Sequence, residues 1–520
     1  IIPFANPADV EVVYVHFWIE ERSPIASLDI ERREVILQRP SRSAMVGSFG
    51  SQLADYYYDN VFEALKKPGQ WYLDRKLGRL YYLPFPQEKI ATAEIYAPRC
   101  LQLIALLGEP EKERWVEFIR FQGLTFCHTD WRHPSHDGAH FHGSSHPDRS
   151  PAVRRYSRGE DAAASQAACD VPGVITMVGA RHCGLEDCAI EHIGWYGVEL
   201  GEGCRSVRIV GNTIRDMGAG GVKINGAAAA ERDARRETCS CRIADNHIHH
   251  GGEIFHSAVG ILAMHVYELV IAHNHIHDLY YSGISCGWEW GYQANISRDN
   301  LIEANHIHDL GKRLLSDMGG IYTLGVQPGT VIRRNLIHHI SSAHYGGWCI
   351  YTDEGSSHII IEDNICHDAD RQPFHQHYGR ENIVRNNIFA FGGESLAHYS
   401  RADGHNGIAF ICNIFLTDGK PIFSAGYSHA LADKRFCSNL NLFYDIKKRP
   451  LACADQGGRR LPWRAWLRLG QDVHSLVADP LFRNWHNRDF RLSPGSPARK
   501  IGFRPIDLSD IGPRPRSRRD

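Results

Sequence analysis

The feature of this chain that most constrains its fold is a sequence repeat in its central part. Copies of one motif, which reads NHIHDL in two cases, begin at Asn274, Asn305, Asn335 and Asn364. Each copy continues with an Ile, a Gly-rich bend and a short aliphatic strand. The period is roughly 30 residues, and self-similarity at such a period is typical of a solenoid or another repeat array.

The anchor motif also predicts how each repeat folds. Side chains of a strand alternate between its two faces, so Asn and Ile of NHIHDL point one way and the two His the other. Inward Ile residues would stack into an apolar ladder, and the Asn side chains would hydrogen-bond from coil to coil, as in stacked strands. The same anchor recurs at Asn212, Asn246, Asn387, Asn413 and Asn441.

These features favour one repeat architecture over the others. No LxxLxL frame recurs, which argues against leucine-rich repeats, and the blades of a β-propeller need about 40 to 50 residues with hairpin turns. We therefore predict an all-β chain whose main body is a right-handed parallel β-helix with three short strands per coil.

The pattern divides the chain into three parts. Residues 1–110 alternate apolar and polar residues in short runs and predict a β-rich accessory domain of hairpins. This domain opens on Ile1, and we expect it to be N-terminally truncated. Residues 111–480 carry the β-helix, with a His-, Ser- and Gly-rich loop inserted at 130–170 that we expect to be mobile. Residues 481–520 are expected to cap the last coil and to end in a frayed basic tail.

Composition excludes some partners. The formal net charge is −2 over 520 residues, which argues against a nucleic acid or an anionic membrane surface. No apolar run of about 18 residues predicts a membrane span. Among fourteen Cys, several replace aliphatic or small residues of the repeat, which predicts buried thiols: Cys183, Cys188, Cys366 and Cys412. We expect an extracellular or periplasmic location, with a signal peptide that is not visible in this chain.

Two carboxylates stand out in the central coils. Aligning the strands places Ile284, Ile321 and Ile350 at equivalent positions. If these Ile point inward, Asp353 points outward, and Asp317 lies in the corner four residues before Ile321. Adjacent coils would bring the two aspartates to within about 5 to 10 Å of each other. A pair at that separation is the arrangement that glycoside hydrolysis requires, although Asp317 could equally cap a turn and Glu354 could replace either partner.

Aromatic and polar residues gather on the same predicted face. Flat rings bind the CH faces of sugars, and polar side chains bind their hydroxyls. We predict substrate contacts from Trp288, Tyr322, His344, Trp348, Tyr351, Glu354, His375, His377, Arg380, Arg401 and His405. A seam with the accessory domain is the alternative for the rings. The paired His of the anchor motif lack a fixed third ligand in the sequence, so we expect no metal and no cofactor.

The residues resemble those of a known family. The stretches YYYDNVFEALKKPGQWYLDRKLGRLYYLP, SDMGGIYTLG, YTDEGSSHIIIEDN, QHYGRENIVRNNIF and DFRLSPGSPARKIGF resemble glycoside hydrolase family 141 and its right-handed β-helix relatives over nearly the whole chain. The resemblance implies α-L-fucosidase or xylanase activity on plant cell-wall glycans such as pectin side chains and xylan. It also implies that Asp317 and Asp353 are the paired catalytic aspartates. Relatives usually carry additional N-terminal sequence and a shorter loop at 130–170.

Three functions follow as hypotheses, because a fold does not decide among them. In a glycosidase, we expect Asp353 as the acid/base and Asp317 as its partner, with the reverse order and the stereochemistry open. In a polysaccharide lyase, His377, Arg380 and Arg401 would neutralise a uronate or abstract its proton. In a non-catalytic carbohydrate-binding β-helix, both aspartates would be dispensable. An oligo- or polysaccharide is the expected partner in each case.

Overall fold

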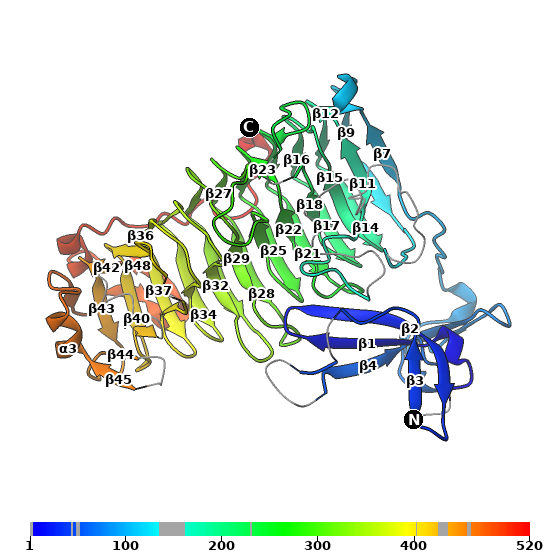
Figure 1. The fold of residues 1–520 in the computed structure, drawn as a ribbon, viewed down its shortest axis with the longest axis horizontal. Coiled ribbons are helices and arrows are strands. Elements are labelled where there is room, and N and C mark those ends of the chain that lie inside the picture. Colours follow the sequence, from blue (N-terminus) through cyan, green and yellow to red (C-terminus); the bar gives the residue numbers. More distant parts are fainter. Residues whose placement is uncertain are drawn as a thin grey trace.

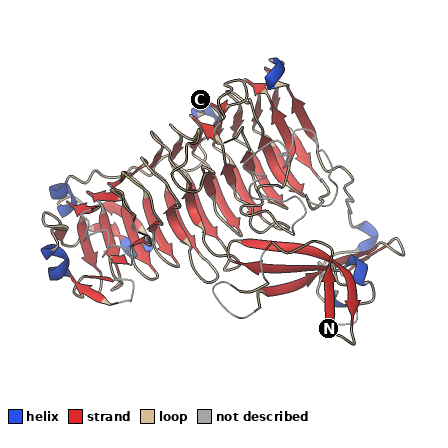
Figure 2. Ribbon diagram, viewed as in Figure 1, coloured by secondary structure: helices blue, strands red, loops and turns tan. Residues whose placement is uncertain are grey.

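Stacked parallel strands form a long β-helix, and a small antiparallel domain lies beside it (Figures 1 and 2). The structure, a computed structural model, describes residues 4–42, 45–47, 53–134, 162–228, 231–401, 403–424, 435–454 and 459–519. Each coil contributes one strand to each of three long parallel sheets. The solenoid predicted from the Asn repeat is therefore confirmed.

The three sheets run the length of the β-helix. The first sheet contains β10 (Thr125–Cys127), β14 (Ala189–Ile193), β17 (Thr213–Met217), β21 (His247–Gly251), β25 (His275–Leu279), β28 (His306–Leu310), β31 (Leu336–Ile340), β34 (Ile365–Ala369), β37 (Ile388–Gly392), β40 (Ile414–Thr417), β43 (Leu442–Asp445) and β46 (Leu476–Val477). The second sheet contains β7 (Ile104–Leu107), β11 (Gly173–Val178), β15 (Tyr196–Leu200), β18 (Val222–Ile224), β22 (Ile261–Ala263), β26 (Ile284–Cys286), β29 (Gly319–Thr323), β32 (Trp348–Thr352), β35 (Phe374–Gln376), β38 (Ala397–Tyr399) and β41 (Phe423–Ser424). The third sheet contains β9 (Arg120–Gln122), β13 (Gly184–Glu186), β16 (Arg208–Val210), β20 (Arg242–Ala244), β24 (Val270–Ala272), β27 (Leu301–Glu303), β30 (Val331–Arg333), β33 (Ile360–Glu362), β36 (Asn382–Arg385), β39 (Ile408–Ile411) and β42 (Phe436–Asn439).

Smaller elements decorate this body. Short strand pairs are formed by β8 (Val116–Glu117) with β12 (Ala180–Arg181), β19 (Thr238–Cys239) with β23 (Val266–Tyr267), and β44 (Ala452–Ala454) with β45 (Arg460–Pro462). Single 3₁₀ turns span Pro7–Asp9, Phe62–Ala64, Ile90–Thr92, Pro110–Lys112, Trp485–Asn487, Pro497–Ile501 and Arg516–Arg518.

The interior of the β-helix is built from the repeat. Ile276, Ile307 and Ile337 are in register on the first sheet and fully buried, so they form the predicted apolar ladder. The anchor Asn residues form a second ladder beside it. Each side-chain amide donates to the side-chain oxygen of the next anchor at 2.9–3.1 Å, from Asn212 through to Asn441. The interior is therefore continuous in both apolar and hydrogen-bonded contacts.

The accessory domain is an antiparallel sheet with strand order β3-β2-β1-β4. Its strands are β1 (Glu11–His16), β2 (Ile19–Asp29), β3 (Glu34–Leu37) and β4 (Asp55–Asp59), and a hairpin follows from β5 (Trp71–Asp74) and β6 (Arg79–Tyr82). The domain is fixed to the β-helix by polar contacts: Ser257 N donates to Glu20 at 2.9 Å, and the Tyr57 hydroxyl lies 2.7 Å from His256 Nε2.

Two predictions for the first coils need correction. The first coil begins before residue 111, because β7 already pairs with β11 in the second sheet. The loop expected at 130–170 falls partly outside the described residues, at 135–161. A mobile loop is wrong for its last part, since Ala162, Ala167 and Cys169 are buried against the β-helix. Small side chains let this backbone pack closely, which its lack of large apolar residues had hidden.

The C-terminal part also differs from the prediction. The last coils are covered before residue 481, by the helix α3 (Trp463–Arg468), whose buried Trp466 stacks on Phe423 with ring centroids 5.1 Å apart. The hairpin of β47 (Phe482–Asn484) and β48 (Asp489–Leu492) then packs its Phe residues against the outer side of the first sheet.

The basic end of the chain is not frayed. The red segment in Figure 1 runs back along the coils. Arg514 pairs with Asp245 at 2.9 Å, and Arg516 and Arg519 pair with Asp187 at 3.1 and 2.5 Å. Carboxylates at the corners of early coils hold these guanidinium groups, which composition alone could not reveal.

All fourteen cysteines lie among the described residues and are thiols outside any disulfide. The expected burial is confirmed for Cys183, Cys188 and Cys366, whereas Cys412 is only half-buried. Within the part of the chain that the structure describes, no helix has the length and apolarity that a membrane crossing requires.

Candidate active site

The two aspartates selected from the sequence lie at opposite ends of neighbouring strands of the second sheet. Asp317 precedes β29, and Asp353 directly follows β32. The predicted register is confirmed, because Ile321 pairs with Ile350 and Tyr322 with Tyr351. Both carboxylates therefore belong to the same pair of adjacent strands, β29 and β32.

Asp353 is surrounded by hydrogen-bond donors. The hydroxyl of Tyr322 donates to its Oδ2 at 2.6 Å, and the hydroxyl of Tyr351 donates to its Oδ1 at 2.7 Å. His377 Nδ1 lies 2.8 Å from the same Oδ1. Asp353 is only 6% exposed, so these donors replace the water that a carboxylate would otherwise bind. A carboxylate anion only accepts hydrogen bonds, and this donor set matches it.

Asp317 lies in a different environment. Removal from bulk water, followed by the charge of Asp353, raises the pKa of its carboxyl from 3.8 to about 7. Interactions with Tyr351, His377 and Tyr345 oppose that rise. The hydroxyl of Tyr345 is 3.5 Å from Oδ2 of Asp317. At neutral pH a large share of Asp317 is therefore protonated, as a general acid must be.

Tyr351 lies between the two carboxylates. Its hydroxyl donates to Asp353 and also interacts with Asp317. Two oxygens that each lie about 2.7 to 3.0 Å from one hydroxyl oxygen, with about 110 to 130° between them, are about 4.5 to 5.5 Å apart. The sequence predicted a separation of about 5 to 10 Å between the two carboxylates, and their shared contact with Tyr351 places the separation at the short end of that range.

The backbone around Asp317 is fixed from three sides. The Tyr281 hydroxyl donates to its carbonyl at 2.8 Å, and its own N–H donates to the Tyr345 carbonyl at 3.1 Å. The preceding Ser316 donates from its N–H to the carbonyl of Phe17 at 2.7 Å, in the β1–β2 turn of the accessory domain. Asp317 has a φ of +58°, a left-handed conformation that Asp tolerates better than most residues.

Gly346 packs closely against the backbone of Asp317 and also fixes its position. A Cβ at Gly346 would lie 2.5 Å from the Asp317 nitrogen, and the φ of Gly346 is +80°. Tyr281 and Gly346 were not among the predicted site residues. The DLYYSG stretch that contains Tyr281 resembles any other bend of the repeat, so the sequence carried no distinct signal.

Two predicted sugar contacts stand behind the aspartates. The ring of His375 stacks on Tyr351 at 4.7 Å, and the ring of Trp348 lies 4.3 Å from the same phenol. Trp348 Nε1 donates to Gln372 at 2.7 Å, and His375 Nε2 is 2.7 Å from Ser400 Oγ. Both side chains are buried, so they position Tyr351, and the structure gives them no open face toward a substrate.

A second group of predicted residues forms a rim beyond Asp353. Glu354 accepts a 3.1 Å hydrogen bond from the Tyr378 hydroxyl, and the Arg401 guanidinium lies 5.5 Å from the centre of the Tyr378 ring. Arg380 lies 5.0 Å from the centre of the Tyr292 ring, and the ring of His405 lies 4.6 Å from the same ring. Tyr292 and Tyr378 were missed in the sequence, although both belong to the aromatic-rich stretches beside predicted residues.

The structure does not bring every predicted residue to the pair. Trp288 is 1% exposed and belongs to the apolar core, where its ring packs against Trp290. His344 is exposed and lies in the segment between β31 and β32. Among the described residues, the side chains of Trp288 and His344 form no hydrogen bond with Asp317 or Asp353.

A surface hollow of about 530 Å³ lies away from the aspartates, on the third sheet. Its lining is Arg120, His182, Ser206, Arg208, Ser240, Cys241, Arg242, Glu268 and Val270. Glu268 is the single carboxylate in that lining, so the hollow lacks the acid and base pair that hydrolysis needs. We therefore place the candidate active site at Asp317 and Asp353, where the chemistry is.

Comparison with known proteins defines the class of fold. Residues 173–343 match the family model of the right-handed β-helix region. A solved structure described as a glycoside hydrolase is 23% identical, with a TM-score of 0.58, and the alignment covers 73% of this chain and 66% of that one. The chain is thus a right-handed parallel β-helix protein.

Other solved structures share less with the chain. XylC in complex with xylose is 13% identical over 81% of this chain and 65% of its own, with a TM-score of 0.40. The A-module of the mannuronan C-5 epimerase AlgE4 of Azotobacter vinelandii is 13% identical over 58% of this chain and 79% of its own, with a TM-score of 0.39. No curated protein sequence matches the chain. The chain spans about two thirds of the length of the first two structures, and its activity must be argued from its own residues.

Proposed function

We propose that this protein is a glycoside hydrolase in which Asp317 is the general acid and Asp353 is the nucleophile. The observation that carries the proposal is the shared hydroxyl of Tyr351, which joins two carboxyls with opposite environments. Two carboxyl groups whose surroundings separate their protonation states are the usual sign of an acid and a nucleophile or base. This order is the reverse of the one favoured from the sequence.

The proposed reaction has two steps. The Asp317 proton passes to the glycosidic oxygen while the bond from this oxygen to the anomeric carbon breaks, and an Asp353 oxygen bonds to that carbon. Water then attacks the same carbon, gives its proton to the Asp317 carboxylate, and releases Asp353. The sum is the addition of one water across one glycosidic bond. His377 and Tyr322 act as positioning residues that hold Asp353.

The substrate we propose is a plant cell-wall-type glycan, with an α-L-fucosyl or a xylosyl unit at the cleaved bond. The rim of Tyr292, Tyr378, Arg380 and Arg401 offers ring faces and cationic donors beside Asp353. Such polymers occur outside the cytoplasm, so the proposal includes an extracellular or periplasmic location. Because none of the fourteen cysteines forms a disulfide, the fold does not depend on disulfides in that compartment.

The test compares three variants on aryl glycosides and on pectin and xylan oligosaccharides. Asp317→Asn should lose about 100-fold or more in kcat/KM on oligosaccharides, yet retain activity on dinitrophenyl glycosides, whose leaving group needs no proton. Asp353→Asn should lose activity on both kinds of substrate. Asp299→Asn, an exposed aspartate in another corner, is the matched control and should behave as wild type.

The same assay can contradict the proposal. If Asp317→Asn and Asp353→Asn keep wild-type rates in an active protein, the carboxylate assignment is wrong. If the products are unsaturated uronates, detected by ultraviolet absorbance, the protein is a lyase. If glycans bind but no product forms with any substrate of the panel, the chain is a binding module.

A further inference from the structure

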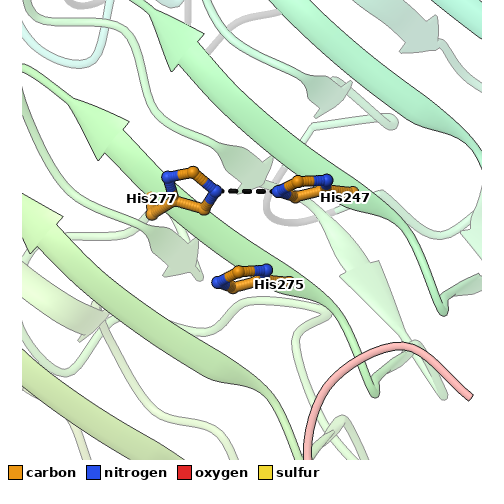
Figure 3. Close-up of side chains that lie close together, drawn as sticks. All are labelled: His247, His275 and His277. Atoms are coloured by element: carbon orange, nitrogen blue, oxygen red, sulfur yellow. Dashed lines mark hydrogen bonds between the residues drawn. The ribbon is translucent and has the colours of Figure 1, made fainter.

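A separate cluster of histidines covers the outer face of the first sheet. Two columns of imidazoles stand side by side there, because the anchor motif places His at two alternate positions of each strand. The first column consists of His247, His275 and His306, and the second column of His249, His277, His308, His338 and His367. Figure 3 shows three of these rings on adjacent strands.

The rings are regularly spaced within each column. His247 and His275 stack with centroids 4.8 Å apart and planes 2° apart, and His275 and His306 with 4.9 Å and 6°. Contacts also run between the columns. His247 Nε2 lies 2.7 Å from His277 Nε2, and His275 Nε2 lies 2.8 Å from His308 Nε2. Each such contact joins one coil to the next.

Carboxylates behind the second column orient its rings. Nδ1 of His277 lies 2.7 Å from Asp278, and Nδ1 of His308 lies 2.7 Å from Asp309. A carboxylate at Nδ1 keeps the proton on that nitrogen and leaves the lone pair on Nε2, where it faces an Nε2 of the first column, and a carboxylate behind the ring in this way is common around zinc. Nε2 of His277 faces Nε2 of His247 in the first column, and Nε2 of His308 faces Nε2 of His275.

We propose that these histidines form a binding site for a divalent transition-metal ion of the zinc class. In each of two sets, one nitrogen from every ring lies within 4.8 Å of the others: His247 with His275 and His277, and His275 with His306 and His308. Zinc with bonds of about 2.0 to 2.1 Å needs ligand nitrogens about 3.3 Å apart, a distance that small ring rotations supply. Three imidazoles suit Zn²⁺, Ni²⁺ or Cu²⁺ better than Mg²⁺ or Ca²⁺.

The five rings of these two sets are also accessible to an ion. All five are half-buried, so an ion reaches them without unfolding of the sheet.

The sequence pattern explains why this site was not predicted. In each set one strand supplies a pair of histidines, and the third ligand comes from the preceding coil, which is 28 or more residues away in the chain. The first column ends at β31, where Leu336 takes the place of a histidine. Both sets use His275, so we expect one ion per chain, and it would join neighbouring coils on a different sheet from Asp317 and Asp353.

The test titrates Zn²⁺ into the tag-free chain after EDTA treatment, by calorimetry and by the melting temperature. Wild type should bind one Zn²⁺ and melt at a higher temperature with it. His275→Gln should weaken Zn²⁺ binding by roughly 100-fold and lose the thermal shift. His277→Gln and His308→Gln should each retain the other set, whereas the double variant should resemble His275→Gln.

His249→Gln is the matched control, because His249 stacks in the same sheet at 5.0 Å from His277 but belongs to neither set of three. It should bind Zn²⁺ as wild type does. Far-UV circular dichroism of every variant in EDTA checks that the fold is kept, and all variants keep the same fourteen cysteines. Equal loss in His249→Gln, or wild-type binding by a folded His275→Gln, would overturn the proposal.

Discussion

The hydroxyl of Tyr351 donates a 2.7 Å hydrogen bond to Oδ1 of Asp353 and also interacts with the carboxyl of Asp317. One phenol thus contacts both members of the proposed catalytic pair. It stabilises Asp353 directly, and it opposes the burial and the charge of Asp353 that together raise the pKa of Asp317. Changes at Tyr351 should therefore affect both carboxylates together.

Tyr351→Phe should lower kcat/KM by about 100-fold, as the loss of one donor in an active site does. The pKa of Asp317 should rise further in this variant, so the descending limb of the pH profile should move to higher pH. Tyr322→Phe is the comparison, because Tyr322 donates to Asp353: it should lower the rate and leave that limb in place. An unmoved limb in Tyr351→Phe would mean that the phenol does not act on Asp317.

The pH dependence of activity should report Asp317. Because burial and Asp353 raise the pKa of its carboxyl to about 7, kcat/KM should fall as the pH rises through about 7 and the acid loses its proton. Measurement of kcat/KM from about pH 5 to about pH 9 checks this. A flat profile across that range would exclude Asp317 as the acid.

Stability should depend on pH through the same group. A carboxyl whose folded-state pKa is raised from 3.8 to about 7 favours folding most at low pH, and that contribution is lost as the pH rises through the folded value. Asp317→Asn removes the ionisable group. Its melting temperature relative to wild type should therefore be higher at about pH 8 than at about pH 5.

The short separation of the carboxyls predicts the stereochemical outcome. Retaining glycosidases hold their carboxyls about 5 to 5.5 Å apart and inverting ones about 6.5 to 9.5 Å. The distance that a shared Tyr351 hydroxyl allows, about 4.5 to 5.5 Å, is on the retaining side. NMR of the first-formed product should show the anomeric configuration of the substrate. Inversion would make Asp353 a base that activates water.

Gly346→Ala should lower activity by displacing Asp317, because the added Cβ would lie 2.5 Å from the Asp317 nitrogen. The positive φ adds a backbone penalty of about 1 kcal/mol, which Gly78→Ala and Gly495→Ala control for. Those glycines also have positive φ, but nothing lies within 4 Å of an added Cβ. The two controls should keep wild-type kcat/KM in the same assay, and a fully active Gly346→Ala would show that Asp317 tolerates the shift.

Asn305→Ala should destabilise the β-helix by about 2 to 6 kcal/mol, since it leaves buried partners on two neighbouring coils without hydrogen bonds. Asn305 accepts from Asn274 and donates to Asn335, each at 2.9 Å. Urea unfolding would measure the loss. The exposed Asn487→Ala should change stability by less than about 0.5 kcal/mol, and a similar small effect for Asn305→Ala would mean that the ladder contributes little.

The sequence predicted the parts of the molecule that repeat. In a solenoid each coil contacts its neighbours, so equal residues at equal spacing must lie in register. The Asn ladder, the alignment of Ile321 with Ile350 and the proximity of Asp317 to Asp353 follow from this rule. The reversal of the acid and nucleophile does not, because it depends on which hydrogen-bond donors and charges surround each carboxyl.

Contacts between distant segments could not be predicted in the same way. The accessory domain holds Ser316 through the carbonyl of Phe17, and residues 162–170 pack as a buried strip. These segments have no periodic pattern and few large apolar residues, so nothing in their sequence states where they dock.

The ion pair between Arg519 and Asp187 joins two residues that are 332 positions apart in the sequence. A plain solenoid is a linear stack whose end coils can peel away one at a time. Here the returning tail ties the last residues of the chain to coils that a ribosome would have released long before. The early coils must therefore stack while their aspartates are still exposed to water. The ion pairs that join these coils to the tail form only after Arg514, Arg516 and Arg519 have been synthesised.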